Sequence, residues 1–175
     1  MNYLLRNSKE KWAPYIIHRY KFHYYENNTE MPDFPLYLIL EPVSSCNLRC
    51  PFCMQSDEKF TSNKDMMGMM ELELFKKIID EAYELGTKAI TLTGRGEPTL
   101  NPHIEEMLEY CSGKFIEIKM NTNATVLNER MCHKILKSGL TDLVFSVDSY
   151  YKEEFESLRV NANFEKVVSN VKKFK

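Results

Sequence analysis

The 175-residue sequence has no hydrophobic run long enough for a membrane span and almost no net charge. A transmembrane helix needs about 18 or more consecutive apolar residues, and the amino terminus lacks the apolar stretch of a secretory signal peptide. The 23 basic and 25 acidic side chains give a formal net charge of −2, so no excess charge favours a nucleic-acid or membrane partner. A composition of 43 % hydrophobic and 27 % charged residues predicts a globular chain rather than a disordered one.

Cysteine is scarce and unevenly distributed. The sequence contains five cysteines, an odd number, and three of them lie within residues 46–53. A secreted disulfide framework usually has an even and dispersed set of cysteines. The pattern therefore predicts a reducing, cytoplasmic location and metal ligation by the three neighbouring cysteines.

The chain divides into two parts with different patterns. Residues 1–33 form an amino-terminal extension rich in aromatic and basic side chains, in which Pro14 is expected to interrupt any helix. In residues 34–175, short apolar segments alternate with amphipathic segments that end at glycines. These patterns predict strands at 36–40, 88–93, 115–120 and 142–147, with a helix after each and the last helix at 164–174.

The predicted strands recur at a constant interval. Three of them begin at residues 88, 115 and 142, which are 27 residues apart. Strand–helix units of constant length imply right-handed crossovers and a parallel sheet, either open or curling toward a barrel. In such α/β folds the chemistry lies at the carboxyl ends of the strands, and the candidate motifs of this sequence fall there.

The first predicted strand leads into a C-x3-C-x2-C motif formed by Cys46, Cys50 and Cys53. Three thiolates at this spacing can converge on one metal centre, and thiolates favour zinc, copper(I) or iron–sulfur clusters. No fourth cysteine or nearby histidine completes a closed zinc site, because Cys111 and Cys132 belong to the apolar faces of predicted helices. Three ligands on a four-iron cluster would leave one iron open for chemistry. A closed zinc site or a ferredoxin-like electron carrier is the alternative.

This motif, with the aromatic Phe52 before its last cysteine, resembles the signature of the radical S-adenosylmethionine (SAM) superfamily. The resemblance extends from about residue 36 to residue 175. It implies a partial TIM-like barrel, of which this chain would form about four of the six (βα) units, and a [4Fe–4S] cluster on the three cysteines. It also implies that SAM binds the open iron through its methionyl amine and carboxylate. Reductive cleavage of SAM would then give methionine and a 5′-deoxyadenosyl radical that abstracts a substrate hydrogen.

The turn after the second predicted strand resembles the Gly-Gly-Glu motif with which the family binds the methionyl amine of SAM. Gly96 and Glu97 match this motif, whereas Arg95 stands where the family usually has its first glycine. Glycine lets the backbone approach a ligand closely, and a carboxylate can accept a hydrogen bond from an ammonium group. The alternative is an ordinary turn before a helix.

The ends of the next two strands resemble further SAM contacts of the family. Asn121 and Asn123 resemble the polar groups that bind the ribose, and Ser146 resembles a serine that contacts SAM. Arg159 stands where related enzymes carry an arginine that pairs with the SAM carboxylate. The alternatives are an asparagine-rich turn and a solvated surface arginine.

The resemblance has consequences for the extent of the chain and for its partners. A radical SAM core has six units, so the last two, with part of the adenine pocket and of the substrate wall, are expected to be missing. Leu143 and Phe145 are then expected to expose apolar surface, which predicts self-association or a partner that supplies the missing strands. A flavodoxin- or ferredoxin-like protein is the expected reductant, and a peptide is the substrate class suggested by analogy. The alternatives are a non-catalytic iron–sulfur electron-transfer protein and an inactive truncated remnant.

Overall fold

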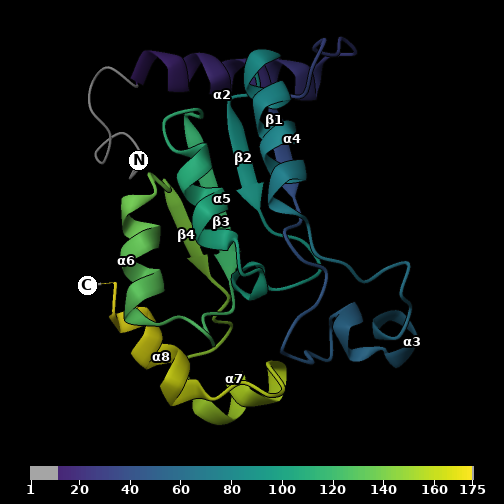
Figure 1. Cartoon of the computed structure of the whole chain (residues 1–175), viewed down its shortest axis with the longest axis vertical. Helices are drawn as coiled ribbons and strands as arrows, with labels where there is room; N and C mark the ends of the chain where they lie inside the picture. Colours follow the sequence, from purple (N-terminus) through teal and green to yellow (C-terminus); the bar gives the residue numbers. More distant parts are fainter. Residues whose placement is uncertain (1–11, 175) are drawn as a thin grey trace.

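The structure, a computed structural model, describes residues 12–174 (Figure 1). From β1 onward, strands and helices alternate along the chain, as the sequence predicts. The elements in chain order are α2 (Trp12–Asn27), β1 (Tyr37–Leu40), η2 (Met54–Ser56), α3 (Glu58–Thr61), α4 (Leu72–Glu84), β2 (Ala89–Leu92), η3 (Pro98–Leu100), α5 (Ile104–Cys111), β3 (Glu117–Thr122), α6 (Glu129–Lys137), β4 (Asp142–Phe145), α7 (Lys152–Leu158) and α8 (Phe164–Lys172).

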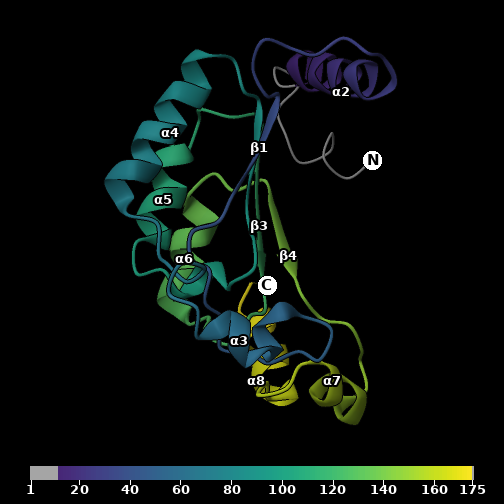
Figure 2. The ribbon, with the colours of Figure 1, turned by 90° about the vertical axis from the view of Figure 1, so that its right-hand side faces the viewer.

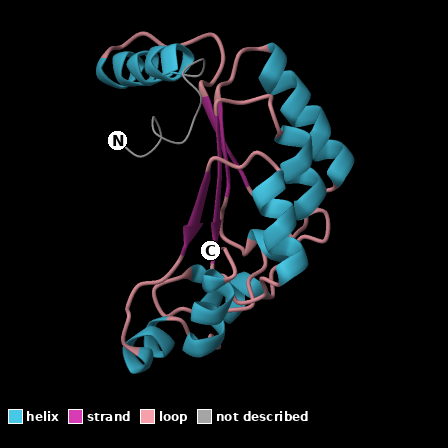
Figure 3. Ribbon diagram, turned by 90° about the vertical axis from the view of Figure 1, so that its left-hand side faces the viewer, coloured by secondary structure: helices cyan, strands magenta, loops and turns pink. Residues whose placement is uncertain are grey.

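The four strands form a parallel sheet in the order β1-β2-β3-β4. Helices α4, α5 and α6 cover one face of this sheet (Figure 2). Figure 3 shows that no helix within residues 12–174 covers the opposite face between α2 at the amino ends of the strands and α7 at their carboxyl ends. The predicted α/β fold of parallel (βα) repeats, a partial barrel, is thereby confirmed.

The hydrophobic core lies between the sheet and its covering helices. Ile90 and Leu92 on β2 alternate with residues of the open face, and Ile118 and Met120 do the same on β3; all four are at most 1 % exposed. Successive side chains of a strand point to opposite faces of the sheet, so each strand contributes every second residue to this core. Burying one such side chain stabilises the fold by about 1.5–3 kcal/mol.

The prediction that Pro14 interrupts any helix in the extension is wrong. Helix α2 includes Pro14 as its third residue. The first four backbone N–H groups of a helix have no partner within the helix, so a proline is tolerated there. Helix α2 crosses the amino ends of the strands (Figure 1) and buries His18. Residues 1–11 of the expected extension lie outside the described residues.

The expectation that Leu143 and Phe145 expose apolar surface is wrong, because other residues form the exposed apolar surface of the sheet. Leu143 and Phe145 pack against the hydrophobic core, whereas Val144 is 40 % and Ile39 is 61 % exposed. The alternation along β4 explains the difference, because the residues flanking Val144 point toward the helices. Between Trp12 and Phe174, no helix has the length and apolar character that a membrane crossing requires.

Candidate functional site

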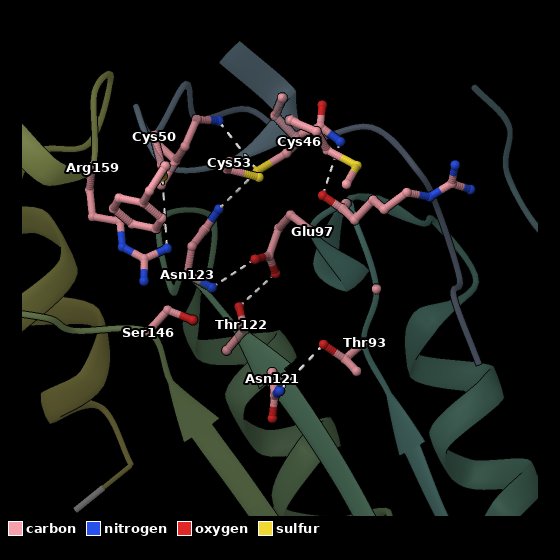
Figure 4. Close-up of a pocket in the computed structure, with 17 residues that line it drawn as sticks. Cys46, Cys50, Cys53, Thr93, Glu97, Asn121, Thr122, Asn123, Ser146 and Arg159 are labelled. Carbon is pink, nitrogen blue, oxygen red and sulfur yellow. Dashed lines mark hydrogen bonds between the residues drawn. The ribbon is translucent and has the colours of Figure 1, made fainter. Parts of the chain in front are cut away.

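A cavity of about 410 Å³ lies at the carboxyl ends of the strands. Its walls come from the loop after β1, the turn after β2, the end of β3 and the segments that follow β4 (Figure 4). The structure places all ten candidate site residues on these walls: Cys46, Cys50, Phe52, Cys53, Gly96, Glu97, Asn121, Asn123, Ser146 and Arg159. Five separate stretches of sequence therefore meet at one cavity.

The three neighbouring cysteines lie on an irregular loop that is held by hydrogen bonds within the loop and by one to the segment after α7. The Arg49 side chain donates hydrogen bonds to the carbonyl oxygens of Cys46 (2.7 Å) and Leu48 (2.8 Å). The Arg49 backbone N–H donates to the carbonyl oxygen of Val160 at 3.0 Å. The thiols are free, so this loop, residues 46–53, presents three potential thiolate ligands from a fixed backbone.

Asn123 connects the cysteine loop to the end of β3. Its side-chain amide donates to Asn47 Oδ1 at 3.0 Å and lies 3.8 Å from Cys46 Sγ. Its own Oδ1 accepts from the backbone N–H and the hydroxyl of Thr125, at 3.0 and 2.7 Å. Burial raises the pKa of the Cys46 thiol, and the nearby Glu97 charge acts in the same direction. Through its contacts with Asn47 and Cys46, Asn123 holds the cysteine loop in place as well as lining the cavity.

The Glu97 carboxylate is a buried hub between β2 and β3. The residue is 3 % exposed, and its Oε1 accepts from the Thr99 N–H (3.2 Å), the Thr99 hydroxyl (2.5 Å) and the Thr122 hydroxyl (2.6 Å). Its Oε2 accepts from the Asn123 N–H at 2.7 Å. A carboxylate oxygen has two lone pairs, and among the described residues Oε2 has one donor. The hub therefore keeps one acceptor position.

Gly96 allows the turn after β2 to pack closely against the backbone of residues 43–45, which precede the cysteine loop. A Cβ atom at Gly96 would lie 2.5 Å from the Ser45 carbonyl oxygen and would overlap the carbonyl oxygen of Val43. The neighbouring Arg95, which departs from the family motif, pairs with Glu41, with Nε at 3.1 Å from both carboxylate oxygens. The arginine is thus accommodated by a partner beside the turn.

Arg159 reaches the cysteine loop from the end of α7. Its Nε donates to Asp148 Oδ2 at 2.5 Å, and its Nη1 lies 3.8 Å from Cys50 Sγ. The guanidinium carbon lies 5.3 Å from the centre of the Phe52 ring. Burial acts to lower the pKa of Arg159, but Asp148 and Cys50 outweigh that effect and raise the pKa above its usual value. Ser146, whose backbone N–H donates to the Thr122 carbonyl oxygen at 2.8 Å, lies on the same side of the cavity (Figure 4).

Two buried acceptors on the cavity walls have no partner among the described residues, Gln55 Oε1 and Asn121 Oδ1. The Gln55 amide nitrogen donates to the carbonyl oxygens of Ser44 (2.6 Å) and Arg95 (2.9 Å). Buried polar atoms are normally hydrogen-bonded, so these walls suit a ligand rich in N–H and O–H groups. The sequence reasoning missed Gln55; its one signal is a polar residue two positions after the last cysteine.

The residues present fit an iron–sulfur cluster better than a single metal ion. Within residues 12–174, no three His, Cys, Asp or Glu side chains are close enough together to bind one metal ion. A four-iron cluster attaches each thiolate to a different iron, so its ligands need to face one cavity rather than converge on one point. Thiolates are the ligands that such clusters use, and Cys111 and Cys132 are buried in the core instead.

A model of the Radical SAM superfamily matches residues 40–175. The tungsten-containing aldehyde ferredoxin oxidoreductase cofactor-modifying protein of Pyrococcus furiosus is 34 % identical over 113 residues, which are 64 % of this chain and 30 % of that protein. GTP 3′,8-cyclase of Clostridium botulinum is 32 % identical over 140 residues, 78 % of this chain and 42 % of that protein. The chain thus spans less than half the length of these curated relatives.

Two crystal structures of SuiB from Streptococcus suis share the fold. SuiB bound to its precursor peptide SuiA has a TM-score of 0.66 and 23 % identity, covering 97 % of this chain and 36 % of SuiB. SuiB bound to S-adenosylmethionine has a TM-score of 0.68 and 21 % identity, covering 96 % of this chain and 37 % of SuiB. At this level of identity the likeness shows the arrangement of strands and helices.

Proposed function

Because the chain belongs to the radical SAM superfamily, we propose that it binds a [4Fe–4S] cluster through Cys46, Cys50 and Cys53 and cleaves SAM reductively. When bound there, the cluster would supply the electron for cleavage of a C–S bond of SAM, which would give methionine and a 5′-deoxyadenosyl radical able to take a hydrogen atom from the substrate. The observation that carries the proposal is the shared cavity, where three free thiols face the polar ends of the strands.

The chain's own residues have the chemistry to hold SAM beside the cysteine loop. The free acceptor position of Glu97 and the close turn at Gly96 suit the methionyl ammonium group. The unpartnered acceptor Asn121 Oδ1 suits the ribose hydroxyls, and the Arg159 guanidinium suits the carboxylate.

The other wall residues have supporting roles in this proposal. Asn123 fixes the cysteine loop and adds polar surface next to the ribose. Ser146 supplies a hydroxyl from the strand end after β4. Phe52, which is 62 % exposed, contacts the Arg159 guanidinium with its ring.

We propose a peptide as the substrate class and a flavodoxin- or ferredoxin-like protein as the electron donor. The likeness to SuiB, which was solved with its precursor peptide, supports the first part. The sheet face that no described helix covers (Figures 2 and 3) leads to the carboxyl ends of the strands, whose residues line the cavity, so a substrate lying on it would be near the radical.

Anaerobic reconstitution of the chain with iron and sulfide tests the proposal. The expected product is brown, and adding SAM to the reduced protein should change its electron paramagnetic resonance spectrum, because SAM would bind the open iron. With a chemical reductant, 5′-deoxyadenosine should form, and the triple alanine variant of the loop cysteines should form none. A reduced cluster whose spectrum ignores SAM would instead identify an electron carrier.

A further inference from the structure

The guanidinium of Arg159 is held along one edge and at one corner. The backbone of Arg159 ends α7, where its N–H donates to the Phe155 carbonyl oxygen at 2.8 Å. Its Nε is held by Asp148 at 2.5 Å, and its Nη1 lies beside Cys50 Sγ. The guanidinium carbon lies over the Phe52 ring, 5.3 Å from its centre. These contacts fix the direction in which the remaining donors point.

The other edge of this guanidinium has N–H donors without an acceptor among the described residues. A guanidinium carries five N–H donors, and among residues 12–174 the Nη2 group of Arg159 has no acceptor within hydrogen-bond distance. The side chain is 16 % exposed and lines the cavity. Nη1 carries two N–H groups and Cys50 Sγ can accept from one of them, so the terminal edge can present one N–H of Nη1 and the parallel N–H of Nη2 to the two oxygens of a carboxylate. The edge is therefore suited to a carboxylate within the cavity.

Asp148 is the residue that sets this geometry. It lies in the segment between β4 and α7, two residues after Ser146, and its side chain is 37 % exposed. Asp148 accepts from Arg159 Nε but does not itself line the cavity. We propose that Asp148 is a positioning residue, which holds the Nε edge of Arg159 so that the opposite edge binds the carboxylate of SAM. The inference rests on the function proposed above and adds a residue to it.

The direction in which SAM affinity changes when Asp148 is removed distinguishes a positioning role from simple charge repulsion. A negative Asp148 would by itself repel the SAM carboxylate, so its removal would strengthen SAM binding if repulsion were its main effect. A positioning role predicts the reverse, because a released guanidinium loses its fixed direction. For metal ligands, losing the partner that orients the ligating side chain lowers affinity about tenfold or more, and we expect a loss of similar size for a guanidinium that binds a carboxylate.

Equilibrium binding of SAM and of decarboxylated SAM to the anaerobically reconstituted full chain tests this. The unchanged chain should bind SAM more tightly than the decarboxylated form. Asp148→Ala should weaken SAM binding about tenfold while changing the binding of decarboxylated SAM less than about twofold. Asp148→Asn, which keeps a neutral acceptor and the side-chain shape, should lie between the two. Glu165→Gln is the matched control, since it removes the same charge from an exposed pair with Lys152.

Each result has a defined meaning. Loss of the preference for SAM in Asp148→Ala, with Glu165→Gln unchanged, supports the proposal. Tighter SAM binding in either Asp148 variant, or an unchanged preference for SAM over its decarboxylated form, overturns it and leaves the proposed function intact. If the unchanged chain binds no SAM, the proposed function fails and this inference fails with it.

Discussion

Replacing Glu97 with alanine is expected to destabilise the fold by about 3–6 kcal/mol. The carboxylate accepts four hydrogen bonds in a buried position. Two of the donors are hydroxyls of Thr99 and Thr122, which can rotate toward other acceptors. The other two are the backbone N–H groups of Thr99 and Asn123, which cannot turn away. A hydrogen bond to a charged group contributes about 1.5–3 kcal/mol, and two such losses give the expected range.

The free energy of unfolding of the apoprotein, measured by urea denaturation with circular dichroism, checks this value. Because small domains are stable by about 5–15 kcal/mol, the Glu97→Ala chain should lose a large part of its total. Glu97→Gln keeps one carbonyl oxygen but turns an amide N–H₂ toward a donor, so we expect a smaller loss of about 1–3 kcal/mol.

Glu73→Gln serves as the control for removing a carboxylate. Glu73 pairs with Lys76 at 2.8 Å, and the Glu73 side chain is 85 % exposed, so this change should cost about 1 kcal/mol or less. If Glu97→Ala loses no more stability than Glu73→Gln, the buried hydrogen bonds do not carry the energy assigned to them. The description of Glu97 as the hub between β2 and β3 would then be refuted.

Gly96→Ala should lower the free energy of unfolding by more than about 2 kcal/mol, because its Cβ would overlap backbone carbonyl oxygens. Gly68→Ala, with nothing within 4 Å of the added atom, should change it by less than about 1 kcal/mol, and equal effects would refute the argument. Alanine at all three loop cysteines should abolish iron binding, whereas Cys132→Ala should retain iron in a metal assay. Burial raises the pKa of Cys111 from 9.0 to about 12, so the folded state favours the neutral thiol. The resulting stability is full below pH 9 and falls as the pH rises toward 12, which denaturation of Cys111→Ala should show by a flatter pH profile. Because Ile39 is exposed on the open face, we expect the chain to self-associate and Ile39→Glu to weaken this association. A monomeric chain without substitutions in sedimentation experiments would contradict this.

Much of the fold could be predicted because its signals are local. The alternation in β2 and β3 and the side chain of Asn128, which caps α6 by accepting from the Met131 N–H at 3.0 Å, depend on neighbours in sequence. Helix α7 escaped prediction because Phe155 is its one buried residue, which leaves no periodic apolar stripe. Helix α2 escaped because Pro14 was interpreted as a breaker without regard to its place in the first turn.

The location of the site was also predictable, since parallel strands bring their carboxyl ends to one edge. The roles of the ten wall residues stay predictions. The contacts that hold the site together could not be predicted, because they join segments far apart in sequence. The amide of Gln55 reaches a carbonyl oxygen 40 residues away, and the amide of Asn47 reaches a hydroxyl 78 residues away. Nothing in the local pattern distinguishes these amides from surface ones.

The distance in sequence between the cysteine loop and the residues that close over it affects how the protein matures. Arg159 lies 109 residues after Cys50, the cysteine beside it, and the Val160 carbonyl oxygen that ties Arg49 comes one residue later. Domains fold while the ribosome is still adding residues, so the three thiols leave the ribosome long before their closing contacts exist. During that interval they are open to oxidation and to stray metal ions. We therefore expect iron delivery to follow synthesis of the segment through Val160, with nascent chains arrested near residue 150 reacting faster with thiol reagents than the 175-residue chain.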